Sequence, residues 1–254
     1  MSYRYDLHTH SRCSDGKLTP TALVDLAAAN GVDVLAVTDH DTVAGVAEAM
    51  QAADGRMQII SGIEFSALWR GYNIHIVGLK IDIHSPGLIN AIKQQQSSRL
   101  SRARTIAERL EKSGIVGAWE GAQHYADGPS IGRPHFAQYL VDSAYVSSFA
   151  EAFSRYLGAG KVGDVKQLWP AIETVIAWIR DSQGLAVLAH PDKYDMTRTK
   201  LYTLLDDFVE AGGEAIELVS GNQTPPVTEK LLRAANHFRL YGRYSRKKVY
   251  LDYV

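Results

Sequence analysis

The sequence predicts an α/β protein with a largely parallel sheet and an all-helical insertion in its middle. Short apolar segments alternate with helical patterns at both ends of the chain, which is typical of parallel sheets. These segments are rich in Val, Ile and Leu, as expected for strands covered on both faces. Between about residues 88 and 168 only helical patterns occur. The middle segment is therefore expected to interrupt the sheet domain.

The expected elements of the sheet domain follow in chain order. Strands are predicted at residues 3–7, 32–38, 58–65, 72–81, 185–189 and 215–219. Helices are predicted at about residues 19–30, 42–53, 170–182, 198–211 and 225–237. Thr19 followed by Pro20 is typical of a helix start, and the Gly212-Gly213 pair of a helix end.

The insertion is expected to contain helices at residues 88–112, 134–141 and 147–156. We divide the chain into a first part of the sheet domain (1–87), the helical insertion (88–168), a second part (169–241) and a basic tail (242–254). The first helix of the insertion carries several arginines, which are interpreted as solvated surface residues without a specific role: Arg99, Arg102, Arg104 and Arg109.

The tail combines basic residues with tyrosines. Such a composition can bind nucleic acid, although a short frayed or foreign terminus is more common.

Composition limits the possible functions. The chain has 254 residues, 46% hydrophobic and 22% charged, with a formal net charge of −1. This balance argues against broad electrostatic capture of nucleic acid or anionic membranes. The single cysteine, Cys13, excludes an internal disulfide and fits a reducing compartment. No signal peptide or apolar run of about 18 residues is present, so we expect a cytoplasmic protein without a membrane span or obligate protein partner.

Metal-ligating residue types follow the predicted strands. His8 and His10 are two residues apart and therefore point the same way along a strand. Imidazole is the commonest metal ligand in proteins. In a parallel barrel the carboxyl ends of the strands converge on one face, where catalytic groups collect. Further candidates at such positions are Asp15, His40 between Asp39 and Asp41, Glu64, His75 and His190.

Each of these residues, taken alone, could have a purely structural role and bind no metal. His75 could be a core histidine with satisfied hydrogen bonds, and Glu64 could cap a turn. Packing explains the whole set poorly, because buried imidazoles and carboxylates are unfavourable unless paired or metal-bound. The nitrogen and oxygen donors suit Mn, Zn or Fe. One glutamate among histidines can bridge two ions, and ions about 3.5–4 Å apart are common in phosphate-ester hydrolysis.

Several segments together resemble the signature of the PHP (polymerase and histidinol phosphatase) family. They are Asp-Leu-His-Thr-His-Ser (6–11), Ser-Asp-Gly (14–16), Thr-Asp-His-Asp (38–41), Gly-Ile-Glu (62–64), His-Ile-Val-Gly (75–78) and Ala-His-Pro (189–191). Three more segments resemble the branch of 3′,5′-nucleoside bisphosphate phosphatases and YciV-type 5′→3′ exoribonucleases (RNase AM). These are residues 132–137, 156–161 and 190–198.

The resemblance implies a distorted (β/α)7 TIM-like barrel with up to three divalent metal sites. Mn²⁺ is the expected metal, with Zn or Fe as alternatives. By motif, the first site contains His8, His10 and Glu64, the second Glu64, His75 and His190, and the third Asp15 and His40. These seven residues are the expected catalytic and metal-binding residues. Asp39 is expected to orient a ligand.

The resemblance also implies a substrate. The expected activity is metal-dependent hydrolysis of the 3′-phosphate of nucleoside 3′,5′-bisphosphates, 5′→3′ exoribonuclease action on short RNA, or both. The helical insertion is expected to cover the metal face and to supply phosphate-binding residues. The candidates are Arg133, His135 and Arg198.

The sequence departs from the branch near its C-terminus. It lacks a segment close to Gly-Ser-Asp-Phe-His, whose Asp completes the first site and whose His completes the third. One or two metal sites are therefore expected to be weakened. The alternative is a truncated or divergent family member, catalytically impaired, that still binds metal or nucleotide.

Overall fold

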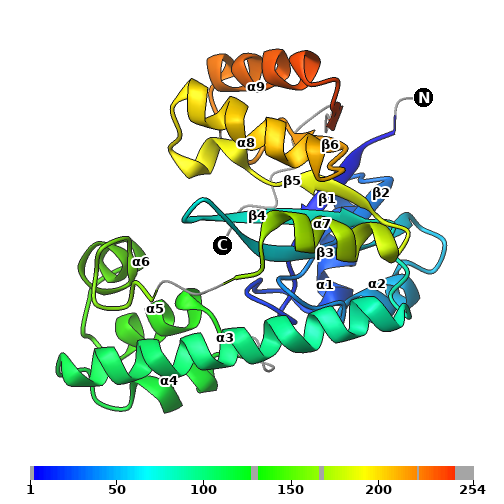
Figure 1. Ribbon diagram of the computed structural model, residues 1–254. Helices are drawn as coiled ribbons and strands as arrows, with labels where there is room; N and C mark the ends of the chain where they lie inside the picture. The colour runs from blue at the N-terminus through cyan, green and yellow to red at the C-terminus, as the bar shows by residue number, and fades with distance from the viewer. Residues whose placement is uncertain (1–2, 127–130, 166–168, 222, 244–254) are drawn as a thin grey trace.

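A computed structural model describes residues 3–126, 131–165, 169–221 and 223–243 of the chain. Its sheet has seven strands in the order of the sequence (Figure 1). They are β1 (Tyr5–Thr9), β2 (Val34–Val37), β3 (Gln58–Trp69), β4 (Tyr72–Leu79), β5 (Leu185–Leu188), β6 (Ala215–Glu217) and β7 (Tyr241–Arg243). From residue 244 on, the predicted basic tail lies outside the described residues.

The expectation of a parallel sheet is wrong at β4. Strands β1, β2 and β3 are parallel, as are β5, β6 and β7, but β4 is antiparallel to both β3 and β5. Only Arg70 and Gly71 connect β3 to β4, with φ of 45° and 84°. A two-residue connection can join only antiparallel strands, because a parallel crossover needs a dozen or more residues. The structure is thus a mixed α/β sheet domain.

The predicted helices of the sheet domain are present within a few residues. Helices α1 (Pro20–Ala29) and α2 (Val46–Ala53) pack on β2, and α7 (Ile172–Asp181), α8 (Arg198–Glu210) and α9 (Pro225–His237) contribute to a second core around β3–β6. The Thr19 side chain accepts a hydrogen bond from the Ala22 N–H at the start of α1, as its sequence predicts.

A third core consists almost entirely of strand residues. Residues from β2 to β6 pack together in it, which indicates that the sheet curls around its own inner face. The members are Val34, Ala36, Ile60, Val77, Leu79, Val187, Ala189 and Ala215. This curl directs neighbouring strand ends toward one region of the molecule.

The middle of the chain is helical, as predicted. It contains α3 (Pro86–Lys112), α4 (Ala118–His124), α5 (Arg133–Asp142), α6 (Phe149–Ala152) and a π-helical turn (Phe153–Leu157). The first turns of α3 pack into the core of the sheet domain through Leu88, and its last turns into a separate helical core through Leu110. Helix α3 therefore links the sheet to α4–α6 (Figure 1). Nowhere in the described part of the chain is a helix both long and apolar enough to cross a membrane.

Gly62 lies where β2 and β3 approach closely, two residues before Glu64. A Cβ at Gly62 would lie 2.7 Å from Thr38 Cγ2 and 2.9 Å from the Val37 carbonyl oxygen. We expect Gly62→Ala to lower the free energy of unfolding by about 1–3 kcal/mol, because the strands must separate. Urea unfolding of the purified proteins measures this change.

Gly87→Ala is the matched control. A Cβ at Gly87, in the first turn of α3, would meet only Ser85 Oγ at 3.8 Å. The free energy of unfolding should stay the same or rise by up to about 1 kcal/mol. Equal stability of the two variants would contradict the close strand approach at Gly62.

Candidate metal centre

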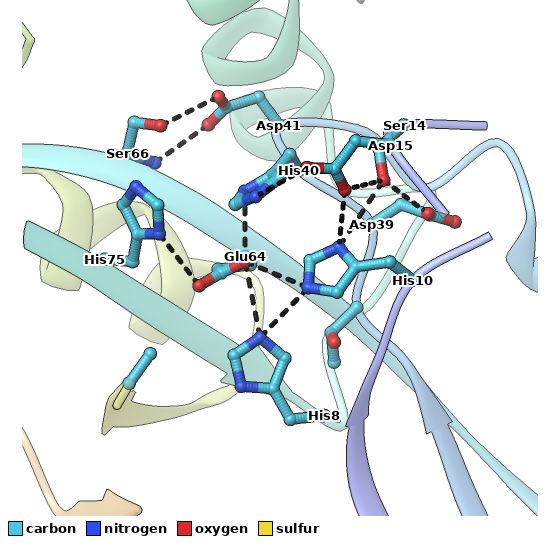
Figure 2. Close-up of polar contacts among 12 residues, drawn as sticks. His8, His10, Ser14, Asp15, Asp39, His40, Asp41, Glu64, Ser66 and His75 are labelled. Carbon is cyan, nitrogen blue, oxygen red and sulfur yellow. Dashed lines mark hydrogen bonds and ion pairs between the residues drawn. The ribbon is translucent and has the colours of Figure 1, made fainter. Parts of the chain in front are cut away.

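The structure brings all seven predicted metal-binding residues together at one edge of the sheet. His8 lies in β1 and His10 directly after it, Glu64 in β3 and His75 in β4, while His40 follows β2 and His190 follows β5. An isolated bridge pairs His40 with Glu64, so the chain after β2 continues alongside β3. Figure 2 shows the side chains of His8, His10, His40 and His75 gathered around Glu64.

Glu64 lies at the centre of this cluster. Its carboxylate oxygen Oε2 lies 3.3 Å from His8 Nε2, 3.2 Å from His10 Nε2 and 3.0 Å from His40 Nδ1. Its other oxygen, Oε1, lies 3.0 Å from His75 Nδ1 and 2.8 Å from His190 Nε2. The Glu64 side chain is 1% exposed. A single buried carboxylate therefore faces five imidazoles and has one oxygen available on each side.

Asp15 forms the second acidic position of the cluster. Its oxygens lie 3.5 Å from His10 Nδ1 and 3.6 Å from His40 Nε2. Asp39 holds the loop that carries Asp15, because its buried carboxylate accepts hydrogen bonds from the Ser11 N–H at 2.7 Å and from Ser14 Oγ at 2.6 Å. The placement of Asp39 behind the cluster agrees with the expected orienting role.

Burial and charge interactions act in opposite directions on the pKa values of the cluster. Burial favours the neutral form of Glu64, but the surrounding histidines outweigh it and hold the pKa of this carboxyl well below its ordinary value. Burial also lowers the pKa of His8 and His40, yet Glu64 with Glu217 (for His8) or Asp15 (for His40) raises both. Burial dominates at His75 and lowers its pKa to about 4. His75 is therefore neutral and able to ligate a metal at neutral pH.

The donor set fits divalent cations. Three groups have ligand atoms within 4.8 Å of one another: His8, His10 and Glu64; His10, Asp15 and His40; and His40, Glu64 and His75. Glu64 Oε2 and His40 Nδ1 are buried without a hydrogen-bond partner in the described part of the chain. Such buried polar atoms are rare unless something else satisfies them. Metal ions between these nitrogen and oxygen atoms would satisfy both.

A cavity extends from the metal-ligand cluster to the helical segment. Arginines from α3 and α5 approach it, and Arg99 and Arg102 are only 8% and 9% exposed. Lining residues are Ser14, Asp15, His40, Ser66, Asn73, His75, Arg99, Arg102, Gly132, Arg133, Pro134, His135, Phe153 and Trp169. The cavity therefore has metal-ligating side chains on one wall and guanidinium groups on the other.

Asp41 connects the two walls. Its buried carboxylate accepts hydrogen bonds from the Ser66 N–H at 3.0 Å and from Gln95 Nε2 at 3.1 Å, and it forms an ion pair with Arg99. Asp41 directly follows His40 and has a φ of 52°. The same short segment thus carries a metal-ligating residue and fixes helix α3 against the sheet.

The predicted substrate-binding residues separate into two places. Arg133 and His135 line the cavity, and His135 Nδ1 accepts a hydrogen bond from the Gly132 N–H at 2.9 Å. Arg198 is exposed at the start of α8, where its guanidinium lies 5.1 Å from the centre of the Tyr202 ring. Arg198 is absent from the described residues that line the cavity, and its role stays a prediction.

Sequence analysis missed the buried arginines of α3. From the sequence, these arginines are interpreted as solvated surface residues. The buried face of α3 instead carries, in order, Leu88, Gln95, Arg99, Arg102 and Ile106, and neighbours in this series are three, four or seven residues apart. Polar residues inside an apolar stripe are a signal that could have identified them.

Glu217 was also missed. It ends β6, and its carboxylate lies 3.1 Å from His8 Nδ1. The strand was predicted to continue to residue 219, so its end was placed two residues too late. With the correct end, Glu217 lies at the end of its strand, as the sequence analysis expects of site residues. That expectation is wrong for Glu64 and His75, which lie inside β3 and the antiparallel β4.

Comparisons with known proteins agree with this geometry. A family model described as PHP domain matches residues 6–182. The chain is 44% identical over 239 residues to a 3′,5′-nucleoside bisphosphate phosphatase of Chromobacterium violaceum, covering 93% of this chain and 84% of that protein. It is also 44% identical over 243 residues to a 5′-3′ exoribonuclease of Haemophilus influenzae, covering 95% and 88%.

Solved structures show the same fold. An amidohydrolase from Chromobacterium violaceum, solved with bound sulfate and no metal, gives a TM-score of 0.91 at 43% identity and covers 94% of this chain and 85% of that one. A protein of Bifidobacterium adolescentis described as a metal-dependent phosphoesterase gives a TM-score of 0.85 at 25% identity, with 95% and 86% covered.

Metal affinity should increase as pH rises from about 6 to about 8. The metal-free cluster holds protons on His8 and His40, whose pKa values are raised, and these protons compete with cations for imidazole nitrogens. Calorimetry with Zn²⁺ in buffers of different ionisation enthalpy measures both affinity and proton release.

His8→Asn should reduce the pH dependence and the number of protons released. His75 is neutral at both pH 6 and pH 8, so it should contribute neither to the pH dependence nor to the proton release. An affinity for Zn²⁺ that does not change with pH would contradict the proposed protonation of the cluster.

Proposed function

Because this chain belongs to the PHP domain family, we propose that it is a metal-dependent phosphoesterase acting on nucleotides or short RNA. The observation that carries the proposal is a cavity lined by Asp15, His40 and His75 of the metal-ligand cluster and by the arginines Arg99, Arg102 and Arg133 of the helical segment. Relatives named as a nucleoside bisphosphate phosphatase and as an exoribonuclease support it.

In the proposed centre, His8, His10 and Glu64 would hold one divalent ion, and Glu64, His75 and His190 would hold a second. Asp15 and His40 contribute to a third. Bound divalent ions supply Lewis-acid stabilisation of phosphoryl oxygens and lower the pKa of a water. Manganese as the metal, a closed (β/α)7 barrel and a cytoplasmic location remain predictions.

The protein's own residues bind and orient the substrate. One phosphate of a nucleoside 3′,5′-bisphosphate would lie against the metal-ligating wall, where hydrolysis occurs. The second phosphate would meet Arg133, with His135 beside it and Arg102 nearby. Guanidinium groups suit phosphate oxygens because they can donate two parallel hydrogen bonds. The helical insertion (88–168) thereby covers the metal face.

The same arrangement accommodates a 5′-phosphorylated RNA end. In that case the arginine wall would hold the terminal phosphate while the metal-ligating wall faces the next phosphodiester. Both substrates place two phosphates at the spacing of one nucleoside. We therefore propose that one site serves both reactions, as the names of the two relatives suggest.

The proposal is tested with purified protein and Mn²⁺. Adenosine 3′,5′-bisphosphate should release inorganic phosphate, and a 5′-phosphorylated RNA oligomer should release 5′-terminal nucleotides. Glu64→Gln should reduce both rates by at least about 100-fold. Replacing a residue that only hydrogen-bonds to a metal ligand typically lowers activity by about 10–100-fold, and the loss of a central ligand should have a larger effect. Tight metal binding without either activity would instead support the catalytically impaired alternative.

Arg133→Met should raise the KM for adenosine 3′,5′-bisphosphate by about 10–100-fold, as expected for loss of a charged hydrogen bond worth about 1.5–3 kcal/mol. A smaller change in kcat is expected, because Arg133 binds the phosphate that does not react. Steady-state phosphate release measures both constants.

Arg198→Met is the control for this experiment. Its guanidinium is exposed and stacks on Tyr202, so we expect a KM close to that of the unchanged protein. A larger effect at position 198 than at 133 would place the second phosphate near α8 instead.

A further inference from the structure

Glu217 lies outside each candidate metal group yet contacts two of the metal-ligating residues. In the described part of the chain, the three groups that could hold an ion do not include it. One of its oxygens, Oε2, lies 3.1 Å from His8 Nδ1 and accepts a hydrogen bond from the His190 backbone N–H at 2.7 Å. A single atom on β6 therefore joins the chain of β1 to the end of β5.

The contact with His8 selects one nitrogen of its ring. A carboxylate oxygen can only accept, so His8 Nδ1 must carry the hydrogen between them. The other nitrogen, Nε2, lies 3.3 Å from Glu64 Oε2, and it would face a metal ion there once its own proton has left. Pairing of the distal imidazole nitrogen with a carboxylate is a common way to fix a histidine as a metal ligand.

The contact with His190 stabilises an unusual backbone conformation. His190 has φ of 27° and ψ of 55°, which non-glycine residues rarely adopt. This conformation turns the ring so that Nε2 lies 2.8 Å from Glu64 Oε1. The rings of His8 and His190 lie nearly parallel, with an interplanar angle of 22° and centroids 5.7 Å apart. Glu217 thus contacts the ring of His8 and the backbone of His190, whose imidazoles meet different oxygens of the Glu64 carboxylate.

We propose that Glu217 is a positioning residue that sets the ring orientation of His8 and the backbone of His190 for metal binding. The inference rests on the metal centre of the proposed function, but its test needs no substrate. It predicts that Glu217 acts through the two histidines and not as a ligand of its own.

The test measures Zn²⁺ affinity by chelator competition, with Zn²⁺ as a diamagnetic probe. Glu217→Ala should weaken binding by about 10–100-fold, the usual effect of removing such a partner. Glu217→Gln keeps an acceptor oxygen, so its Zn²⁺ affinity should fall less than that of Glu217→Ala. Glu214→Gln is the matched control: Glu214 directly precedes β6 and is exposed, so we expect unchanged affinity.

Two further readouts distinguish positioning from a general structural effect. Long-range ¹H–¹⁵N NMR should show His8 protonated at Nδ1 in the Zn²⁺-loaded protein, and the Glu217→Ala spectrum should lose this single tautomer. In a double-mutant cycle, Glu217→Ala should weaken Zn²⁺ binding less when His8 is already replaced by alanine.

Circular dichroism reports whether Glu217→Ala folds. If it does not, Glu217→Asp carries the same test, because it keeps the charge and shortens the reach by one methylene group. Unchanged Zn²⁺ affinity and an unchanged His8 tautomer in a folded Ala or Asp variant would overturn the positioning role alone. Absence of Zn²⁺ binding by the unchanged chain would overturn the metal centre as well.

Discussion

The buried Glu64 carboxylate is the constraint on which the site depends. It is 1% exposed and meets five imidazoles, from four separate segments of the chain, at 2.8–3.3 Å. A carboxylate at this depth is unfavourable unless opposite charge is close by. Protons on the histidines provide this charge in the metal-free protein, and divalent ions can replace them. The curled sheet is the means by which four distant segments reach one carboxyl group.

The substrate cavity depends on the same part of the sheet. Asp41 directly follows His40 and pairs with Arg99 of the long helix α3. A buried ion pair therefore fixes the sheet and helix α3 to each other beside the metal-ligating residues. This arrangement sets the relative position of the cations and the arginines, which a substrate with two phosphates would need to contact together.

Local patterns predicted most helices and strands, but not α4 or β7, and motif spacing identified seven residues that the structure brings together, because periodicity and spacing are local properties. The role of these seven residues as metal ligands stays a prediction. Three features escaped prediction because they depend on tertiary partners. Strand β4 is antiparallel owing to a two-residue turn, and Arg99 and Arg102 are buried only because the sheet and helical core enclose them. Glu217 was not recognised as a site residue because the predicted strand ended at residue 219, whereas β6 ends at Glu217.

The β3–β4 hairpin has a consequence for the order of assembly. Glu64 and His75 are 11 residues apart and become neighbours as soon as this hairpin closes, whereas His190 is 126 residues from Glu64 and Glu217 is 209 residues from His8. Short loops close far more readily than long ones. A growing chain therefore acquires a partial ligand pair early, the last predicted ligand, His190, only after β5, and the positioning carboxylate of Glu217 only after β6.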